Sequence, residues 1–155
     1  NRRTQMSEEI NIQAMEPSDI LELLVIWRMT PGMSLRKRDD SAEKLELFIC
    51  RNADYCFTAK KDGKLIGGVL CGSDARRAII YHTVVLEDYR NKGVGGRLIK
   101  AVLEALEKDK IGKAYLSVDV DNAAGLKFWL GLGFEEAKGI RWLERKIAVE
   151  GNEKI

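Results

Sequence analysis

The first part of the chain shows a strand periodicity followed by two helical ones. Residues 10–15 alternate apolar and polar side chains, which predicts a strand, and 17–29 place Pro17 at the start of a helix with one apolar face. A polar loop over 30–40 separates this helix from a second one, for which Ser41 is a typical N-terminal cap. The pattern therefore predicts one strand followed by two helices.

A β-hairpin and another strand are predicted next. The apolar segments 55–61 and 64–72 are joined by the dipeptide Asp62-Gly63, which favours a tight hairpin turn. Residues 78–86 are rich in β-branched and aromatic side chains, which favours a third strand. These three segments together indicate an antiparallel meander.

The last third of the chain alternates between helix and strand. Residues 94–108 repeat apolar side chains on one helical face, whereas 114–120 alternate as a strand does. A short helix over 122–133 is predicted to end on a glycine C-cap, and a final strand is predicted over 140–147. One parallel crossover is therefore expected to connect the antiparallel meander to the strand over 114–120.

The predicted order is β-α-α-β-β-β-α-β-α-β, which indicates an α+β fold with a mixed, twisted sheet flanked by helices. A chain of 155 residues can bury one substantial core, so we expect a single domain over 6–150. Residues 1–5 precede the pattern and are interpreted as a cloning remnant or a disordered tail.

Composition narrows the class of partner. A net charge of +2 with 32% charged residues indicates no massed basic face, so nucleic acid is not an expected partner. No apolar run approaches the roughly 20 residues of a membrane span, so no membrane association is expected. Cys50, Cys56 and Cys71 lack metal-binding spacing and are typical of reduced thiols, so we expect a cytoplasmic protein without a metal site.

The segment YRNKGVGGRL at 89–98 carries the clearest chemical signal. Gly93, Gly95 and Gly96 stand where a helix begins and leave its first N–H groups uncovered. These groups and the positive end of the helix dipole favour an anion, phosphate above all. Because glycines at the start of a helix cost conformational entropy without a gain in packing, we favour an anion site over a plain helix start.

Two common phosphate-binding motifs do not fit this segment. A P-loop would require Lys and then Ser or Thr after its last glycine, and here VGGRL follows Gly93. The dinucleotide fingerprint GxGxxG fails at its third glycine, where Leu98 stands. Nucleoside triphosphates and NAD are therefore not expected ligands.

With Arg90, Gly93 and Gly95, the segment VVLEDYRNKGVGGRL resembles the acyl-CoA-binding motif of the GNAT superfamily of N-acetyltransferases. Asn122 and the LGF at 132–134 are similar to the second cofactor motif of that superfamily. The segments CGSDARRAIIYHTVV and FWLGLGF resemble a bacterial-type branch of it. The resemblance covers about residues 77–137 and implies the GNAT fold, with acetyl-CoA as co-substrate.

The resemblance also implies a set of cofactor-binding residues. The pantetheine arm would enter between central strands that splay near 80–86 and 114–120, next to the backbone of Val85. Arg90 and Arg97 could screen phosphate charge or lie in solvent. Main-chain N–H groups of the glycine turn would hold the pyrophosphate, and the whole expected set is Val85, Arg90, Gly93, Val94, Gly95, Gly96, Arg97, Asn122 and Trp129.

Amide formation from a thioester requires a base for the amine and a proton for the leaving thiolate. The superfamily often takes that proton from a tyrosine three residues before LGF, but Trp129 stands there and its indole is not a useful acid. Tyr81 and Tyr115 are the phenols that strand alternation leaves near the cleft. His82, the only histidine, is the candidate base, although alternation places it on the opposite face from Tyr81; a structural histidine and a water relay are the alternatives.

Two charged segments could bind the acceptor. Arg76 and Arg77, with Asp74 in the same turn, are expected to bind an acidic end of the substrate because guanidinium groups match carboxylates. The charged loop 36–40 is interpreted as solvated. Neither the amine nor the acyl chain follows from the sequence.

The sequence thus predicts an N-acetyltransferase that acts on a primary amine of a small molecule or peptide. Direct attack in a ternary complex is expected because no cysteine lies near the glycine turn. Trp129 motivates one alternative, a non-catalytic module that senses acyl-CoA; another is a protein acetyltransferase acting on N-termini or lysines. An apolar Trp142 near the C-terminus is compatible with a homodimer.

Overall fold

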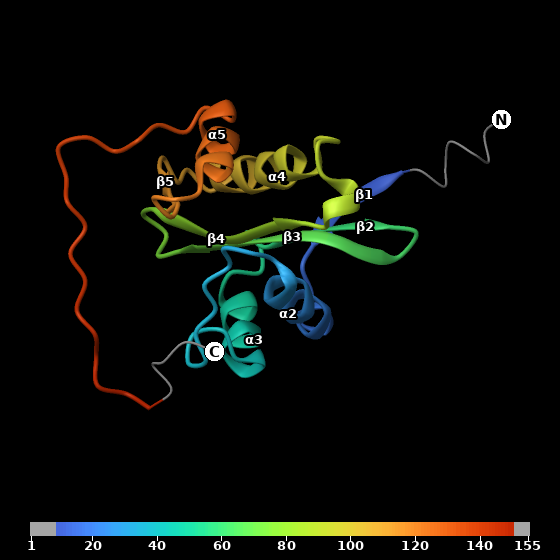
Figure 1. The fold of residues 1–155 in the computed structure, drawn as a ribbon, viewed down its shortest axis with the longest axis horizontal. Coiled ribbons are helices and arrows are strands. Elements are labelled where there is room, and N and C mark those ends of the chain that lie inside the picture. The colour runs from blue at the N-terminus through green and yellow to red at the C-terminus, as the bar shows by residue number, and fades with distance from the viewer. Residues whose placement is uncertain (1–8, 151–155) are drawn as a thin grey trace.

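The computed structural model describes residues 9–150 and has a five-stranded sheet between two layers of helices (Figure 1). The strand order is β1-β2-β3-β4-β5, antiparallel from β1 to β4 and parallel between β4 and β5. This arrangement confirms the predicted α+β fold class. The tail expected at 1–5 lies outside the described residues.

The strands are β1 (Ile10–Ala14), β2 (Phe57–Lys61), β3 (Lys64–Ser73), β4 (Ala78–Val85) and β5 (Ala114–Tyr115). The helices are η1 (Pro17–Asp19), α2 (Ile20–Met29), α3 (Ala42–Arg51), η2 (Glu87–Tyr89), α4 (Val94–Lys108) and α5 (Ala123–Gly131). Each predicted helix is confirmed, with a first turn of 3-10 geometry ahead of α2. Ser41 caps α3 as predicted, because its hydroxyl accepts a hydrogen bond from the Lys44 N–H at 3.2 Å.

The two helical layers bury separate faces of the sheet (Figure 1). Helices α2 and α3 cover one face, where Leu23, Trp27 and Ile49 are almost completely buried. Helix α4, with α5 beside it, covers the other face and buries Leu98 and Val102. Both faces of the central strands are therefore covered, which explains why β3 reads as a continuous apolar run rather than an alternation.

Helix α5 ends on the predicted glycine C-cap. Gly133 has a left-handed φ of 90°, and its N–H donates to the Leu130 carbonyl at 3.1 Å. The next N–H, of Phe134, donates to the Trp129 carbonyl at 3.2 Å, and the two rings pack edge to face with centroids 5.1 Å apart. This cap fixes Trp129 against the core.

A β-bulge interrupts β4 at His82. Gly68 pairs with Val84 and Leu70 with Tyr81, so two residues of β4 oppose the single residue between them in β3. His82 itself has a left-handed φ of 40°. In an unbroken strand, Ile80 and Val84 would lie on the same face of the sheet. Because the bulge adds one residue, Ile80 packs toward α4 whereas Val84 packs toward α2. The prediction that His82 and Tyr81 lie on opposite faces is therefore wrong, since it assumed unbroken alternation.

The strand predicted over 114–120 is much shorter in the structure. Only Ala114 and Tyr115 pair with β4, opposite Ala78 and Ile79. Beyond them, a cavity separates residues 116–119 from the bulged part of β4. Alternation of side chains does not by itself make a strand, because a β-ladder also requires a neighbouring strand within hydrogen-bonding distance.

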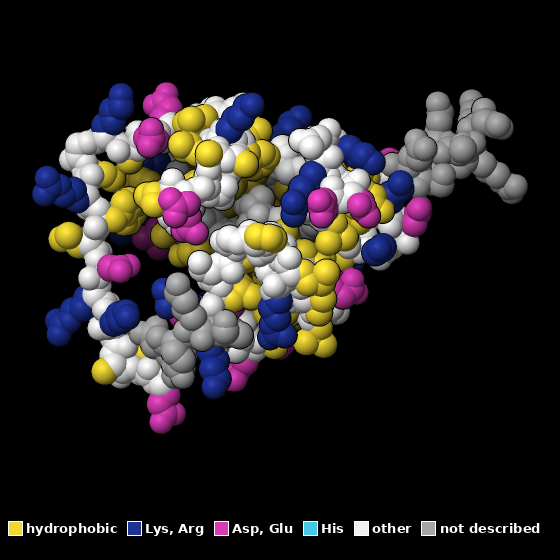
Figure 2. All heavy atoms as spheres, viewed as in Figure 1, with side chains coloured by type: hydrophobic (Ala, Val, Ile, Leu, Met, Phe, Trp, Pro, Cys, Tyr) yellow, Lys and Arg dark blue, Asp and Glu magenta, His cyan; other side chains and the backbone are white. Residues whose placement is uncertain are grey.

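The final strand predicted over 140–147 is wrong. Residues 135–150 contain no strand and run away from the sheet as an extended segment at the left of Figure 1. Trp142 is 71% exposed and Leu143 is 91% exposed, and Figure 2 shows basic side chains projecting outward from this segment. A two-residue β5 offers too short an edge for another strand to join, which is the physical reason for the difference.

Among residues 9–150, no helix combines the length and the apolar composition that crossing a membrane would require.

Candidate active site

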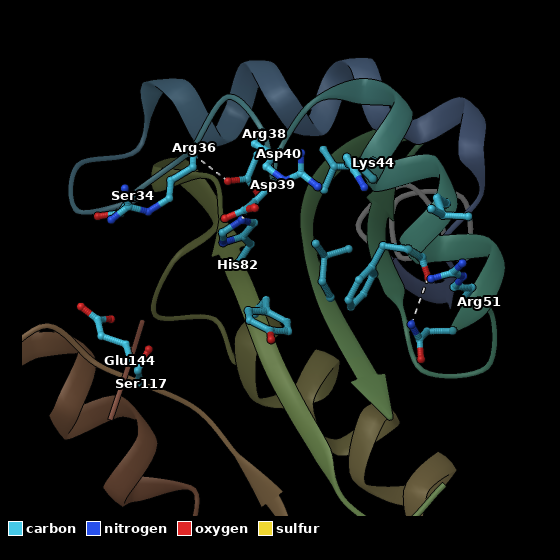
Figure 3. Close-up of a pocket in the computed structure, with 16 residues that line it drawn as sticks. Ser34, Arg36, Arg38, Asp39, Asp40, Lys44, Arg51, His82, Ser117 and Glu144 are labelled. Atoms are coloured by element: carbon cyan, nitrogen blue, oxygen red, sulfur yellow. Dashed lines mark hydrogen bonds and ion pairs between the residues drawn. The ribbon is translucent and has the colours of Figure 1, made fainter. Parts of the chain in front are cut away.

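Two cavities meet at the bulge of β4. The larger, of about 880 Å³, lies between the loop 30–40, α3 and β4 (Figure 3). The narrower, of about 250 Å³, lies between β4 and residues 116–122. The residues that line both cavities are Ser34, Tyr81, His82 and Ser117. A molecule that fills the narrow cavity therefore reaches the larger one beside His82.

One of the residues that line the narrow cavity carries an unsatisfied polar group. Thr83 lines it, and the Thr83 hydroxyl is buried without a hydrogen-bond partner in the described part of the chain. Asn122 also lines it, while its side-chain oxygen caps α5 by accepting from the Gly125 N–H at 2.9 Å. Trp129 also lines it, and its ring packs against Phe128 at a centroid distance of 5.0 Å. The cavity thus combines polar groups with apolar side chains such as Ile80 and Leu116.

The glycine turn lies at the end of β4 and begins α4. Gly93 is the N-cap with a left-handed φ of 77°, and no side chain caps the first N–H groups of the helix. A Cβ on Gly95 would lie 3.0 Å from the Phe128 ring and 3.8 Å from the Val85 side chain. A side chain at Gly95 would therefore require the Phe128 ring to shift, and the bare helix start adjoins the end of the strand that borders the narrow cavity.

Both arginines of this region contact main-chain carbonyls. The Arg90 Nε donates to the Val85 carbonyl at 2.9 Å, and an Arg97 Nη donates to the Ile10 carbonyl at 2.9 Å. Arg90 thereby ties the glycine turn to the end of β4. The roles of Arg90 and Arg97 toward a phosphate remain predictions.

His82 forms a close pair with Asp40. The His82 Nε2 lies 2.6 Å from the Asp40 Oδ1, and the other carboxylate oxygen of Asp40 accepts from the Arg36 N–H at 2.8 Å. Asp40 is only 6% exposed, and the Trp27 ring packs 5.1 Å from the imidazole. Burial raises the pKa of Asp40, but the hydrogen bonds and charges of His82 and Arg36 outweigh it and the pKa lies below its usual range. Asp40 is therefore an ionised acceptor beside the candidate base.

Sequence reasoning missed Asp40. It lies in the loop that was interpreted as solvated, directly after Asp39, which is exposed. Nothing in the local pattern distinguishes the two aspartates, because the feature that matters is a contact across 42 positions of the chain. Only the folded bulge brings the two groups together.

The two candidate phenols lie in different surroundings. Tyr81 lines both cavities at His82, and burial together with the charge of Asp39 raises the pKa of its hydroxyl. Tyr115 lines a third cavity of about 370 Å³, which Tyr81 also borders but His82 does not, and its ring packs on Trp142 with ring centroids 5.8 Å apart. The structure thus brings Tyr81, and not Tyr115, next to His82.

The turn expected to bind substrate is held together by its own charges. Arg76 pairs with Asp74 at 3.0 Å on the open surface, and the backbone N–H groups of Arg77 and Arg76 lower the pKa of Asp74 to about 2. Arg77 lies over the Tyr115 ring at 5.5 Å and lines the same 370 Å³ cavity as Asp74. A substrate-binding role for these three residues remains a prediction.

Comparison with known proteins finds similar acetyltransferases. An acetyltransferase of Pectobacterium atrosepticum is 25% identical over 89% of this chain and 96% of its own length. N-alpha-acetyltransferase 30 of Schizosaccharomyces pombe is 27% identical to this chain. The similar region covers 56% of this chain and 61% of that protein. The PaiA N-acetyltransferase of Thermoplasma acidophilum, solved in complex with coenzyme A, has the same fold: its TM-score is 0.74 at 24% identity, covering 82% of this chain and 90% of that one.

The match to the description of a known protein family covers most of the fold. Residues 21–134 match the description of the acetyltransferase (GNAT) family, from α2 through the glycine C-cap of α5. The matched range includes the glycine turn, the bulge of β4 and Asp40. Because it covers more than half of the sequence, it shows that the chain belongs to the GNAT family of acetyltransferases.

Proposed function

We propose that this protein transfers an acetyl group from acetyl-CoA to a primary amine of a small molecule or peptide, by direct attack in a ternary complex. The observation that carries the proposal is the junction of the two cavities at His82. A thioester at the end of the narrow cavity and an amine in the larger one would meet beside a potential base. The coenzyme A complex of the structurally similar PaiA protein supports the assignment of the co-substrate.

The residues around the narrow cavity fit coenzyme A. The uncapped start of α4 after Gly93 presents bare N–H groups and a helix dipole, which suit a pyrophosphate. The polar groups of the lining suit the amides of the pantetheine arm, and apolar side chains such as Ile80 and Leu116 suit its alkyl segments. When bound, acetyl-CoA supplies the activated acyl group, and the protein has to position the amine and move protons.

His82 takes the proton of the amine in this proposal. Because the Asp40 carboxylate can only accept, the Nε2 of His82 carries the hydrogen in their contact, which leaves Nδ1 with a free lone pair. The negative charge of Asp40 also stabilises the imidazolium that forms. Asp40 thus orients His82, whereas His82 is the group that contacts the amine.

Tyr81 supplies the proton for the leaving thiolate. Its hydroxyl stays protonated at neutral pH, since burial and the nearby Asp39 raise its pKa. It lines both cavities, as a donor to the departing sulfur must. Trp129 cannot perform this step, because an indole N–H is too weak an acid.

Thermal unfolding with acetyl-CoA, coenzyme A and NAD tests the cofactor assignment. A ligand at a hundredfold over its dissociation constant adds about 2.7 kcal/mol of stability, which raises the melting temperature by several degrees. We expect a rise with both coenzyme A species and none with NAD. No rise with either coenzyme A species would contradict the assignment.

Release of free thiol on addition of amines tests catalysis itself. We expect thiol release with at least some primary amines and an acetylated product of matching mass. Tight binding of acetyl-CoA without turnover of any amine would instead support the non-catalytic module. Acetylation confined to N-termini or lysines in a protein mixture, read by mass spectrometry, would support the protein acetyltransferase.

A further inference from the structure

The wall of the larger cavity is rich in basic side chains. Arg36 and Arg38 reach it from the loop above His82, and Lys44 and Arg51 reach it from α3 (Figure 3). Arg36 and Arg38 are half-buried, so part of their hydration is already lost. Four cations from two neighbouring segments therefore face one hollow.

None of these cations forms an ion pair in the described part of the chain, although the charge of Arg36 also acts on the Asp40 carboxylate. Within residues 9–150, the ion pairs are Lys60 with Asp19, Arg76 with Asp74, His82 with Asp40, and Lys100 with Glu104. The four basic side chains of the cavity appear in none of them. Half-buried guanidinium groups without an anion are costly unless a ligand neutralises them, which suggests that the cavity takes one.

The acidic groups of the same cavity do not cancel this charge. Asp40 is committed to His82 and to the Arg36 N–H, which leaves Asp39 and Glu144 as the other carboxylates of the lining. Four cations thus face two uncommitted carboxylates. Figure 3 shows Glu144 beside Ser117, across the cavity from the loop residues. The site has a basic side and, opposite to it, one acidic group that can attract an ammonium.

We infer that the acceptor is a primary amine that also carries an anionic group, a carboxylate or a phosphate, bound by Arg36, Arg38, Lys44 and Arg51. The amine lies at His82 and the anion on the basic side. Arginine forks suit both oxyanions, since each offers two oxygens in the plane of the guanidinium. Polycationic amines fit poorly, because they would bring further positive charge to this wall.

The loop that carries Arg36 and Arg38 lies directly beside His82. The backbone N–H of Arg36 and the imidazole of His82 contact the two oxygens of one carboxylate, that of Asp40. An anion held by this loop and an amine at His82 therefore belong to one cavity. We expect compact amino acids or amino phosphates to be better substrates than amines with a distant charge.

Paired substrates test this inference, which rests on the acetyl transfer proposed above. β-Alanine is compared with β-alaninamide, and O-phosphoethanolamine with ethanolamine, by thiol release at matched ionic strength. We expect kcat/KM to be about tenfold or more higher for the anionic member of at least one pair. The two pairs distinguish carboxylate from phosphate. The anionic member holds its ammonium proton more tightly, so intrinsic reactivity works against the expected result.

Charge-removing variants locate the effect. Arg36→Gln with Arg38→Gln, and separately Lys44→Gln, should lower kcat/KM for the anionic amine about tenfold and leave the neutral amine nearly unchanged. Lys37→Gln is the matched control, because Lys37 lies in the same loop, is exposed and does not line the cavity. Its kinetics should equal those of the parent protein. Lys44 is exposed on α3, so its variant remains informative if the double variant fails to fold.

The outcomes separate this inference from the acetyl transfer on which it rests. Neutral amines that are turned over as well as their anionic partners in both pairs would overturn the substrate class and leave the acetyltransferase intact. If no amine is turned over, calorimetric titration of β-alanine and O-phosphoethanolamine into the coenzyme A-bound protein decides. The anion site would be supported, without catalysis, if Arg36→Gln with Arg38→Gln weakens this binding and Lys37→Gln does not. Absence of binding would overturn the anion site.

Discussion

The Nε2 of His82 lies 2.6 Å from the Oδ1 of Asp40, although the two residues are 42 positions apart in the chain. The contact joins the bulge of β4 to the loop that precedes α3. It also couples the left-handed backbone at His82, where φ is 40°, to a buried carboxylate. A strained backbone at a cavity junction, held by a charged hydrogen bond, is what positioning of a base requires.

Asp40→Asn should destabilise the protein by about 1–3 kcal/mol at neutral pH. The carboxylate accepts from both the His82 Nε2 and the Arg36 N–H, whereas an amide offers only one accepting oxygen. One donor is therefore left unpaired in a buried place. Chemical denaturation of both proteins measures the difference, and equal free energies of unfolding would show that the contact contributes nothing.

The same variant should change how stability depends on pH. The pKa of Asp40 is lower in the folded protein than in the unfolded chain, so its contribution is complete above the unfolded value and is lost as pH falls below about 4 toward the folded pKa. Wild type should lose this part of its stability as pH falls below about 4, and Asp40→Asn should lack that loss. Parallel curves for the two proteins across this range would contradict the assignment.

Gly95→Glu should abolish binding of acetyl-CoA. A Cβ at this position meets the Phe128 ring at 3.0 Å, and the new carboxylate repels phosphate at the start of α4. Gly112→Glu is the matched control, because its Cβ would meet no atom within 4 Å and it lies beyond the other end of α4. The ligand-induced rise in melting temperature should disappear in the first variant and persist in the second. A persisting rise in Gly95→Glu would exclude the glycine turn as the pyrophosphate site.

Tyr81→Phe should lower kcat by about tenfold or more without weakening acetyl-CoA. The Tyr81 hydroxyl has a raised pKa and should therefore still donate a proton at pH 9, so the parent enzyme should not lose activity through this group below about pH 10. Tyr115→Phe removes the same atom from the third cavity, which His82 does not line, and should leave kcat nearly unchanged. The reverse ranking of the two variants would assign the proton to Tyr115.

Local chemistry made much of the fold predictable from the sequence. The Ser41 cap, the turn after β2 and the glycine C-cap at Gly133 each depend on neighbouring residues alone, and all three are confirmed. The family resemblance around the glycine turn is confirmed for the same reason, since its motif is contiguous. Local motifs of this kind can be predicted from the sequence because they do not depend on tertiary contacts.

The candidate site depended on features that no local pattern carries. The bulge that turns His82 toward Asp40 is set by the pairing of β4 with β3, and alternation within β4 alone placed His82 on the wrong face. The strand expected over 140–147 failed for a related reason, because apolar alternation does not specify an edge to pair with. Interpreting the loop 36–40 as solvated likewise missed the cavity that it covers.

The turnover of His82→Gln tests the central claim most directly. Glutamine is close in size and can still donate a hydrogen bond to Asp40, but it cannot take a proton from an amine. With saturating acetyl-CoA and the best amine, kcat should fall by about 10²-fold or more, while the rise in melting temperature with coenzyme A stays the same. A kcat within about twofold of wild type would contradict His82 as the base and leave the junction of the two cavities without its proposed chemistry.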